Sequence, residues 1–162
     1  MMGGHTAMQI RRGTEADIDD LLVIEDECFS IYYYGQYKFG VEEFLYYLYG
    51  PNCILLVAAP NGHITGYTAA VVRRPRAGAT LHIDSIAVRS DHRNQGIGNQ
   101  LLQALTEEAR QQCCTTLVLE VATPNEAGIA FFKNHGFREI RKLPNYYGRA
   151  LDGILMTTEV SR

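Results

Sequence analysis

The segment Ile83-Asp-Ser-Ile-Ala-Val-Arg-Ser-Asp-His-Arg-Asn-Gln-Gly-Ile-Gly98 says most about the fold of this chain. Its first six residues include an apolar, β-branched run that predicts a strand ending at Val88. A polar turn follows, and Arg93-x-x-Gly96-x-Gly98 then opens an amphipathic helix. Glycines let an anion approach backbone N–H groups, and the helix N-terminus adds partial positive charge. The segment therefore predicts a strand–turn–helix unit that holds a phosphate group.

Length and composition indicate an ordinary cytoplasmic protein. The 162 residues are 46% hydrophobic and 20% charged, with a net charge of −3. We expect a disordered lead-in over residues 1–7 and a single domain over residues 8–162. No apolar run approaches the ~20 residues that span a bilayer, and the charge favours no nucleic-acid partner. The four cysteines form no C-x-x-C pair, so we expect reduced thiols and no metal site.

Periodicity and turn residues predict alternating runs of strands and helices. Thr123-Pro-Asn-Glu126 combines a capping box with Pro at the first helical position, which predicts Thr123 as a helix N-cap. The order mixes antiparallel hairpins with two βα units, so we expect a three-layer, mixed α/β fold. The strands are expected at 8–12, 53–59, 64–72, 81–89, 117–121, 137–141 and 151–160, and the helices at about 18–29, 41–48, 97–109 and 124–134.

Two common phosphate motifs do not fit this loop. A dinucleotide fingerprint needs a third glycine where Leu101 stands, and a Walker loop needs Lys after Gly98, where Asn99 stands. Taken alone, the loop could also be a glycine-rich helix entry without a ligand. However, Arg93-x-x-Gly96-x-Gly98, placed after Ile86-Ala-Val88, resembles the acyl-CoA pyrophosphate loop of the GNAT superfamily of N-acyltransferases.

A second motif strengthens this resemblance. The segment Asn125-Glu-Ala-Gly-Ile-Ala-Phe-Phe-Lys-Asn-His-Gly-Phe137 is similar to the family's N-x-x-A-x-x-F-Y-x-x-x-G-F pattern. Membership implies a mostly antiparallel central sheet, splayed between its fourth and fifth strands, with helices on both faces. It also implies acetyl-CoA as the cofactor. The positions that would then contact the cofactor are Ile86, Ala87, Val88, Arg93, Asn94, Gln95, Gly96, Ile97, Gly98, Asn99, Asn125, Ala127, Phe131, Phe132 and Lys133.

Within the superfamily, the chain looks most similar to ribosomal-protein-alanine acetyltransferases and other protein N-terminal acetyltransferases. The residues behind this are Ser85-Ile-Ala-Val88, Leu119-Glu-Val121 and Asn145-Tyr-Tyr147. The resemblance implies acetyl transfer to the α-amine of a protein or peptide. A small amine, such as a polyamine, an amino acid or an antibiotic, is an alternative acceptor, and a non-catalytic CoA-binding module is a second alternative. Both a monomer and a homodimer remain open.

Amide formation requires a neutral amine and a protonated leaving group. At pH 7 about a tenth of an α-amine is neutral, because its pKa is about 8, whereas lysine has a pKa of about 10.4. Glu120 matches the family position that acts as the base. The family's proton-donating Tyr is replaced by Phe132, so Tyr147 or Tyr146 would supply the proton, or the thiolate would leave unassisted. The residues expected to line the acceptor site are Tyr32, Tyr33, Asp84 and Tyr146.

Overall fold

One seven-stranded sheet organises the described residues. The computed structural model describes residues 9–29 and 38–161. The strands lie in the order β1-β2-β3-β4-β5-β7-β6, and every pair is antiparallel except β4 with β5. The expected mixed, mostly antiparallel sheet is therefore confirmed. The strand bounds are β1 Ile10–Arg12, β2 Cys53–Ala58, β3 Gly66–Arg73, β4 Thr80–Val88, β5 Thr116–Ala122, β6 Arg138–Leu143 and β7 Gly153–Glu159.

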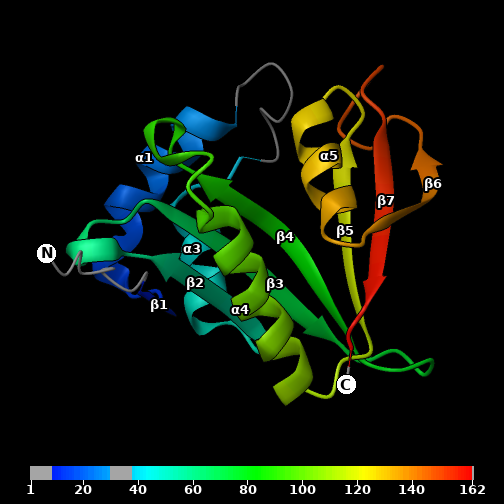
Figure 1. Cartoon of the computed structure of the whole chain (residues 1–162), viewed down its shortest axis with the longest axis horizontal. Helices are drawn as coiled ribbons and strands as arrows, with labels where there is room; N and C mark the ends of the chain where they lie inside the picture. Colours follow the sequence, from blue (N-terminus) through cyan, green and yellow to red (C-terminus); the bar gives the residue numbers. More distant parts are fainter. Residues whose placement is uncertain (1–8, 30–37, 162) are drawn as a thin grey trace, which may run out of the picture.

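Helices cover both faces of this sheet, as Figure 1 shows. Helices α1 (Ile18–Cys28) and α3 (Val41–Tyr49) pack on one face, and α4 (Ile97–Gln111) and α5 (Glu126–Asn134) lie on the other. Each face has its own hydrophobic core, because alternate residues of a strand point to opposite sides. Three layers result, in agreement with the sequence. No helix in the described part of the chain is both long and apolar enough to span a bilayer.

The two parallel strands stay together only at one end. Their register pairs Thr80–His82 of β4 with Thr116–Val118 of β5. Beyond this point the strands diverge, so that β5, β7 and β6 form a separate wing in Figure 1. The expected splay between the fourth and fifth strands is thus confirmed. It leaves the inner edge of β4 after His82 without β5 as a hydrogen-bonding neighbour.

A β-bulge interrupts β4 inside this split. Ala69 of β3 lies opposite Ser85, whereas Ala70 lies opposite Ile83, so Asp84 is the extra residue. A bulge changes the direction of the side chains beside it. Asp84 lies on the same face as His82, two residues earlier, and its carboxylate meets Tyr47 of α3 there. The bulge brings the next residue, Ser85, to this face as well, beside Tyr67.

The predicted N-cap of α5 is wrong by two residues. The helix begins at Glu126, and Asn125 is its N-cap, with the Oδ1 atom accepting from the Gly128 N–H at 3.0 Å. Thr123 instead continues the strand pairing through its N–H to the Asp152 carbonyl, and Thr123 and Pro124 form a turn that the Asn125 N–H closes on the Ala122 carbonyl at 2.9 Å. The end of the helix agrees with the sequence: Gly136 follows it with a φ of +85°.

Candidate active site

The turn between β4 and α4 presents a row of backbone donors. Asn94 and Gly96 both have left-handed backbones, with φ values of 59° and 82°, and α4 begins directly after them. Gln100 is the first residue whose N–H bonds back, to the Gly96 carbonyl at 3.0 Å. The N–H groups just before it therefore have no acceptor within the helix. Such a helix start attracts an anion.

These donors open onto a groove between α4 and α5, which we name the α4–α5 groove. All the predicted cofactor residues line it except Gln95 and Lys133. Gln95 is exposed, and Lys133 forms an ion pair with Glu139 at 3.0 Å. The residues that line the groove are Ile86, Ala87, Val88, His92, Arg93, Asn94, Gly96, Ile97, Gly98, Asn99, Asn125, Ala127, Gly128, Phe131 and Phe132.

The two helices beside this groove are held together by close contacts. A Cβ on Gly98 would lie 3.4 Å from the Phe131 ring, so glycine allows the approach. The His135 ring bridges the helices, with Nδ1 2.7 Å from the Phe131 carbonyl and Nε2 2.9 Å from Asn99 Oδ1. These contacts between α4 and α5 set the width of the groove.

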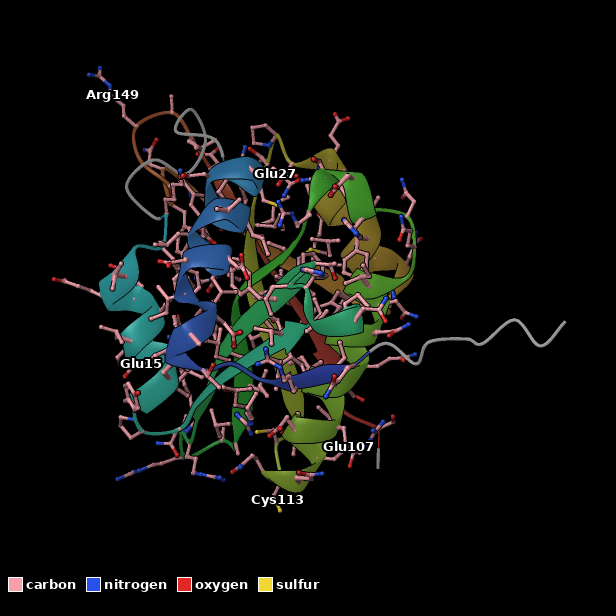
Figure 2. The ribbon with its side chains drawn as sticks, turned by 90° about the vertical axis from the view of Figure 1, so that its left-hand side faces the viewer. Glu15, Glu27, Glu107, Cys113 and Arg149 are labelled. Atoms are coloured by element: carbon pink, nitrogen blue, oxygen red, sulfur yellow. The ribbon has the colours of Figure 1, made fainter. Side chains whose placement is uncertain are left out.

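The C-terminal end of α1, on the opposite face of the sheet, is hydrogen-bonded to the turn between β4 and α4. Glu27 accepts hydrogen bonds from the backbone N–H and hydroxyl of Ser90, and Figure 2 shows Glu27 at the end of α1. The Val88 carbonyl accepts from the Cys28 thiol and from Arg93 Nε, each at 3.2 Å. Arg93, predicted to meet the cofactor, is thus anchored beside the groove through its Nε atom.

A second cavity, which we name the split pocket, lies where β4 and β5 diverge. It opens toward the face covered by α1. It shares Ile86, Asn125 and Phe132 with the α4–α5 groove, so the two cavities meet at the split. The residues that line the split pocket are Glu25, Phe29, Phe39, Ile83, Asp84, Ser85, Ile86, Leu119, Glu120, Val121, Asn125, Phe132 and Tyr147.

The predicted catalytic and acceptor residues are only partly brought together. Glu120, Tyr147 and Asp84 all line the split pocket. Tyr146 does not line it: its side chain covers Gly153, and the residue is 40% exposed. The predicted acceptor residues Tyr32 and Tyr33 lie outside the described residues.

A histidine that sequence reasoning missed connects two of these carboxylates. His82 Nε2 lies 2.7 Å from Glu120 Oε2, and His82 Nδ1 is hydrogen-bonded to Asp84 Oδ1. The side chains of His82 and Glu120 are only 12% and 16% exposed. The signal was present in the sequence, because His82 and Asp84 are two residues apart on a predicted strand and so share a face.

The surroundings favour the charged form of His82. Burial alone would lower the pKa of this imidazole, but hydrogen bonds and charge attraction from Asp84 and Glu120 outweigh it and raise the pKa to about 9. The same cluster suppresses ionisation of Tyr47: burial, together with its hydrogen bond to Asp84, raises the pKa of this phenol. The contacts of His82 with Asp84 and Glu120 therefore favour the imidazolium form of this ring.

Glu25 is a further carboxyl group that sequence reasoning missed. It is 2% exposed at the inner end of the split pocket, where it accepts hydrogen bonds from the Tyr67 hydroxyl and from the Phe39 N–H at 3.1 Å. Tyr67 Oη is also 2.8 Å from Ser85 Oγ. Burial raises the pKa of Glu25. Because both oxygens are engaged, this group fixes the pocket wall.

Comparison with known proteins agrees with this geometry. The model of the acetyltransferase (GNAT) family matches residues 18–137. The chain therefore belongs to the GNAT family and is an N-acetyltransferase.

Two relatives cover most of the chain. An uncharacterized N-acetyltransferase from Methanocaldococcus jannaschii is 32% identical over 150 residues, which are 92% of this chain and 90% of the relative. An N-alpha-acetyltransferase from Sulfurisphaera tokodaii is 29% identical, with 91% and 90% covered. Among solved structures, a ribosomal-protein-alanine N-acetyltransferase from Brucella melitensis superposes with a TM-score of 0.77, at 30% identity, over 94% of this chain and 99% of that one.

Proposed function

We propose that this enzyme transfers the acetyl group of acetyl-CoA to the N-terminal α-amine of a protein or peptide. One observation carries the proposal: two cavities on opposite faces of the sheet meet at the split, with Glu120 beside the junction. A cofactor in one cavity and an amine in the other would react directly. The similarity to an N-alpha-acetyltransferase and to a ribosomal-protein-alanine N-acetyltransferase supports an α-amine as acceptor.

The α4–α5 groove suits a coenzyme A thioester. The free donors at the start of α4 would bind its phosphates, and the inner edge of β4 from Ile86 to Val88 would hydrogen-bond its amide arm. When bound, the cofactor supplies an acetyl group activated as a thioester. The apolar walls at Ala87, Phe131 and Phe132 would exclude water from it.

Glu120 is the group we assign to take the proton from the amine. Its carboxylate lies in the split pocket and is held from one side by His82 at 2.7 Å. An α-amine has a pKa of about 8, so a carboxylate acting directly or through a water molecule can help to deprotonate it. A lysine side chain, with a pKa near 10.4, would need more assistance. This chemistry favours N-termini over lysine side chains.

Tyr147 is the group we assign to protonate the departing sulfur. Phe132 occupies the family's tyrosine position and has no hydroxyl, whereas Tyr147 lines the split pocket. Tyr146 is exposed and covers Gly153 instead. Of the two neighbouring tyrosines, Tyr147 is therefore the better placed donor.

A small cationic amine is a second candidate acceptor. Three carboxyl groups, from Glu25, Asp84 and Glu120, line the split pocket, and an acidic pocket attracts a polyamine. Two features reduce that attraction. The His82 imidazolium offsets one negative charge, and both oxygens of Glu25 are already hydrogen-bonded. We therefore rank the peptide N-terminus first.

Turnover with a matched set of amines tests the proposal. Acetyl-CoA consumption is measured with short peptides that have free N-termini, the same peptides with blocked N-termini, free amino acids and polyamines. We expect kcat/KM to be at least tenfold higher for free N-terminal peptides than for every other class. Activity confined to the polyamines or amino acids would contradict the proposal and favour the second candidate.

A further inference from the structure

His82 and Asp84 point to the same side of β4 because they are two residues apart. The register then skips Asp84, since Ile83 and Ser85 face consecutive residues of β3, and this bulge turns Ser85 to the same side. As a result His82, Asp84 and Ser85 all direct polar groups toward the face covered by α1 and α3. The bulge therefore gathers three polar side chains at the split, with Asp84 in contact with His82.

Both carboxylate oxygens of Asp84 are engaged. Oδ1 is bound to His82 Nδ1, and Oδ2 accepts from the Tyr47 hydroxyl on α3. Tyr47 is itself buried and stacks on Phe39 with ring centroids 5.3 Å apart. The carboxylate is therefore held from two sides. An acceptor amine would have to compete with both contacts to bind it.

The arrangement fixes the number of protons on the His82 ring. An ionised carboxylate can only accept hydrogen bonds, and a neutral imidazole has one donor and one acceptor nitrogen. The ring faces Asp84 at one nitrogen and Glu120 at the other. Both contacts can be hydrogen bonds to ionised carboxylates only when both ring nitrogens carry protons. Asp84 supplies the second of these two contacts.

We propose that Asp84 is a positioning residue that acts through His82: it holds the ring in place and in its doubly protonated form, so that Nε2 remains directed at Glu120. This rests on the proposed function of Glu120 as the base. In this proposal Asp84 acts on the reaction through His82 and Glu120, whereas the sequence-based prediction has it contact the acceptor amine directly.

The charged groups around this ring come from several elements. Asp84 lies on the same strand, Glu120 on β5 and Tyr47 on α3. The charge of Asp84 also contributes to raising the pKa of Tyr46 and of Cys53. Glu25 shares the split pocket from α1. Asp84 and Glu120 are the two that contact the ring directly, and Asp84 can be neutralised without altering the base.

Nitrogen-15 NMR of the His82 ring tests this assignment independently of any substrate. The signals of His82 are assigned by their loss in His82→Gln. In the wild-type enzyme at pH 8 we expect both ring nitrogens to be protonated, and in Asp84→Asn we expect the titration midpoint to fall by at least one pH unit. Asp19→Asn, an exposed change on α1, is the matched control and should leave the midpoint unchanged.

The NMR outcomes that overturn the proposal are simple. A wild-type ring that is singly protonated at pH 8 would overturn it, and so would an unchanged midpoint in a folded Asp84→Asn enzyme. The wild-type measurement needs no variant, so a failure of Asp84→Asn to fold does not remove the test. Neither result depends on which amine the enzyme acetylates.

Steady-state kinetics with the best acceptor from the turnover panel add a second readout. In Asp84→Asn we expect kcat to fall about tenfold, the acceptor KM to stay within about twofold, and the alkaline limb of the kcat–pH profile to move to lower pH. A raised KM with unchanged kcat would instead show that Asp84 binds the acceptor directly. A lower kcat with an unshifted pH profile would indicate a merely structural role.

Discussion

His82 of β4 and Glu120 of β5 face each other at the apex of the split, with Nε2 and Oε2 2.7 Å apart. His82 also forms the last backbone pairing between the two strands, with Val118. The side-chain contact therefore begins where the backbone contact ends. It fixes the carboxylate in the wall of the split pocket, which shares three lining residues with the α4–α5 groove.

Removing the charge of Glu120 should slow the reaction far more than it weakens binding. For Glu120→Gln we expect kcat to fall by about 10²-fold or more, since a general base contributes roughly 10²–10⁴-fold. Acetyl-CoA affinity, measured by calorimetry, should change less than about threefold. Glu159→Gln on β7, outside both cavities, is the control. An unchanged kcat in Glu120→Gln would exclude this residue as the base.

The two neighbouring tyrosines should behave differently. Tyr147→Phe removes a hydroxyl from a residue of the split pocket, so we expect kcat to fall by about tenfold or more. Tyr146→Phe changes an exposed side chain and should leave kcat within about twofold. Equal effects in both variants, or none in either, would contradict the assignment of the proton donor.

The raised pKa of His82 predicts how stability depends on pH. The folded-state pKa of about 9 lies above the ordinary histidine value of 6.5, so charged His82 stabilises the folded state fully below pH 6.5. This contribution should be lost as the pH rises through 9. It amounts to at most about 3.5 kcal/mol, from about 1.4 kcal/mol per pKa unit. Urea unfolding at pH 6 and 10 measures it, and in His82→Gln this part of the dependence should be absent.

Gly96 should be required for acetyl-CoA binding because of its left-handed backbone conformation, and not because a side chain would lack space there. Its φ is +82°, and a Cβ placed there would meet nothing within 4 Å. A β-branched residue is strained in this conformation, whereas Asn adopts it more readily, as Asn94 does nearby. We expect Gly96→Val to weaken acetyl-CoA binding more than tenfold and Gly96→Asn to weaken it only a few-fold. Similar losses in both variants would argue against a conformational role.

Asn125 combines a helix cap with a place at the junction of the two cavities. Asn125→Asp keeps an oxygen for the Gly128 N–H, and Asn125→Ala removes it. We therefore expect Ala to lower the free energy of unfolding by about 1 kcal/mol, while Asp leaves it nearly unchanged. If the side-chain amide also contacts the cofactor, both variants should raise the Kd of acetyl-CoA. Unaltered binding in Asn125→Asp would remove that contact from the account.

Local patterns predicted the groove well. The glycine spacing of Arg93-x-x-Gly96-x-Gly98 and the apolar periodicity of the following helix depend on neighbours in sequence, and the structure places most of the predicted residues around one groove. The order of strands and helices also followed from local periodicity. The split itself was inferred from family resemblance, and the register of β4 with β5 shows where it begins.

The features that the sequence did not predict depend on contacts between residues far apart in the chain. The pairing of His82 with Glu120 joins residues far apart in sequence and needs the sheet register to bring them together. The N-cap of α5 was missed because the strand pairing continues to Thr123, which bonds to the Asp152 carbonyl, and a turn over Thr123 and Pro124 then delays the helix to Glu126. A local capping pattern does not show how far the pairing with a later segment extends. Arg149, in the loop before β7, points away from the body of the protein in Figure 2, and no sequence pattern showed this.

The most direct test of the central claim is to locate the acetyl group after a single turnover. A peptide that carries both a free N-terminus and an internal lysine is incubated with enzyme and acetyl-CoA at pH 7, and the product is sequenced by mass spectrometry. We predict acetylation at the α-amine, at least tenfold over the lysine, and its loss in Glu120→Gln. Acetylation mainly at the lysine, or equal yields with Glu120→Gln, would contradict it.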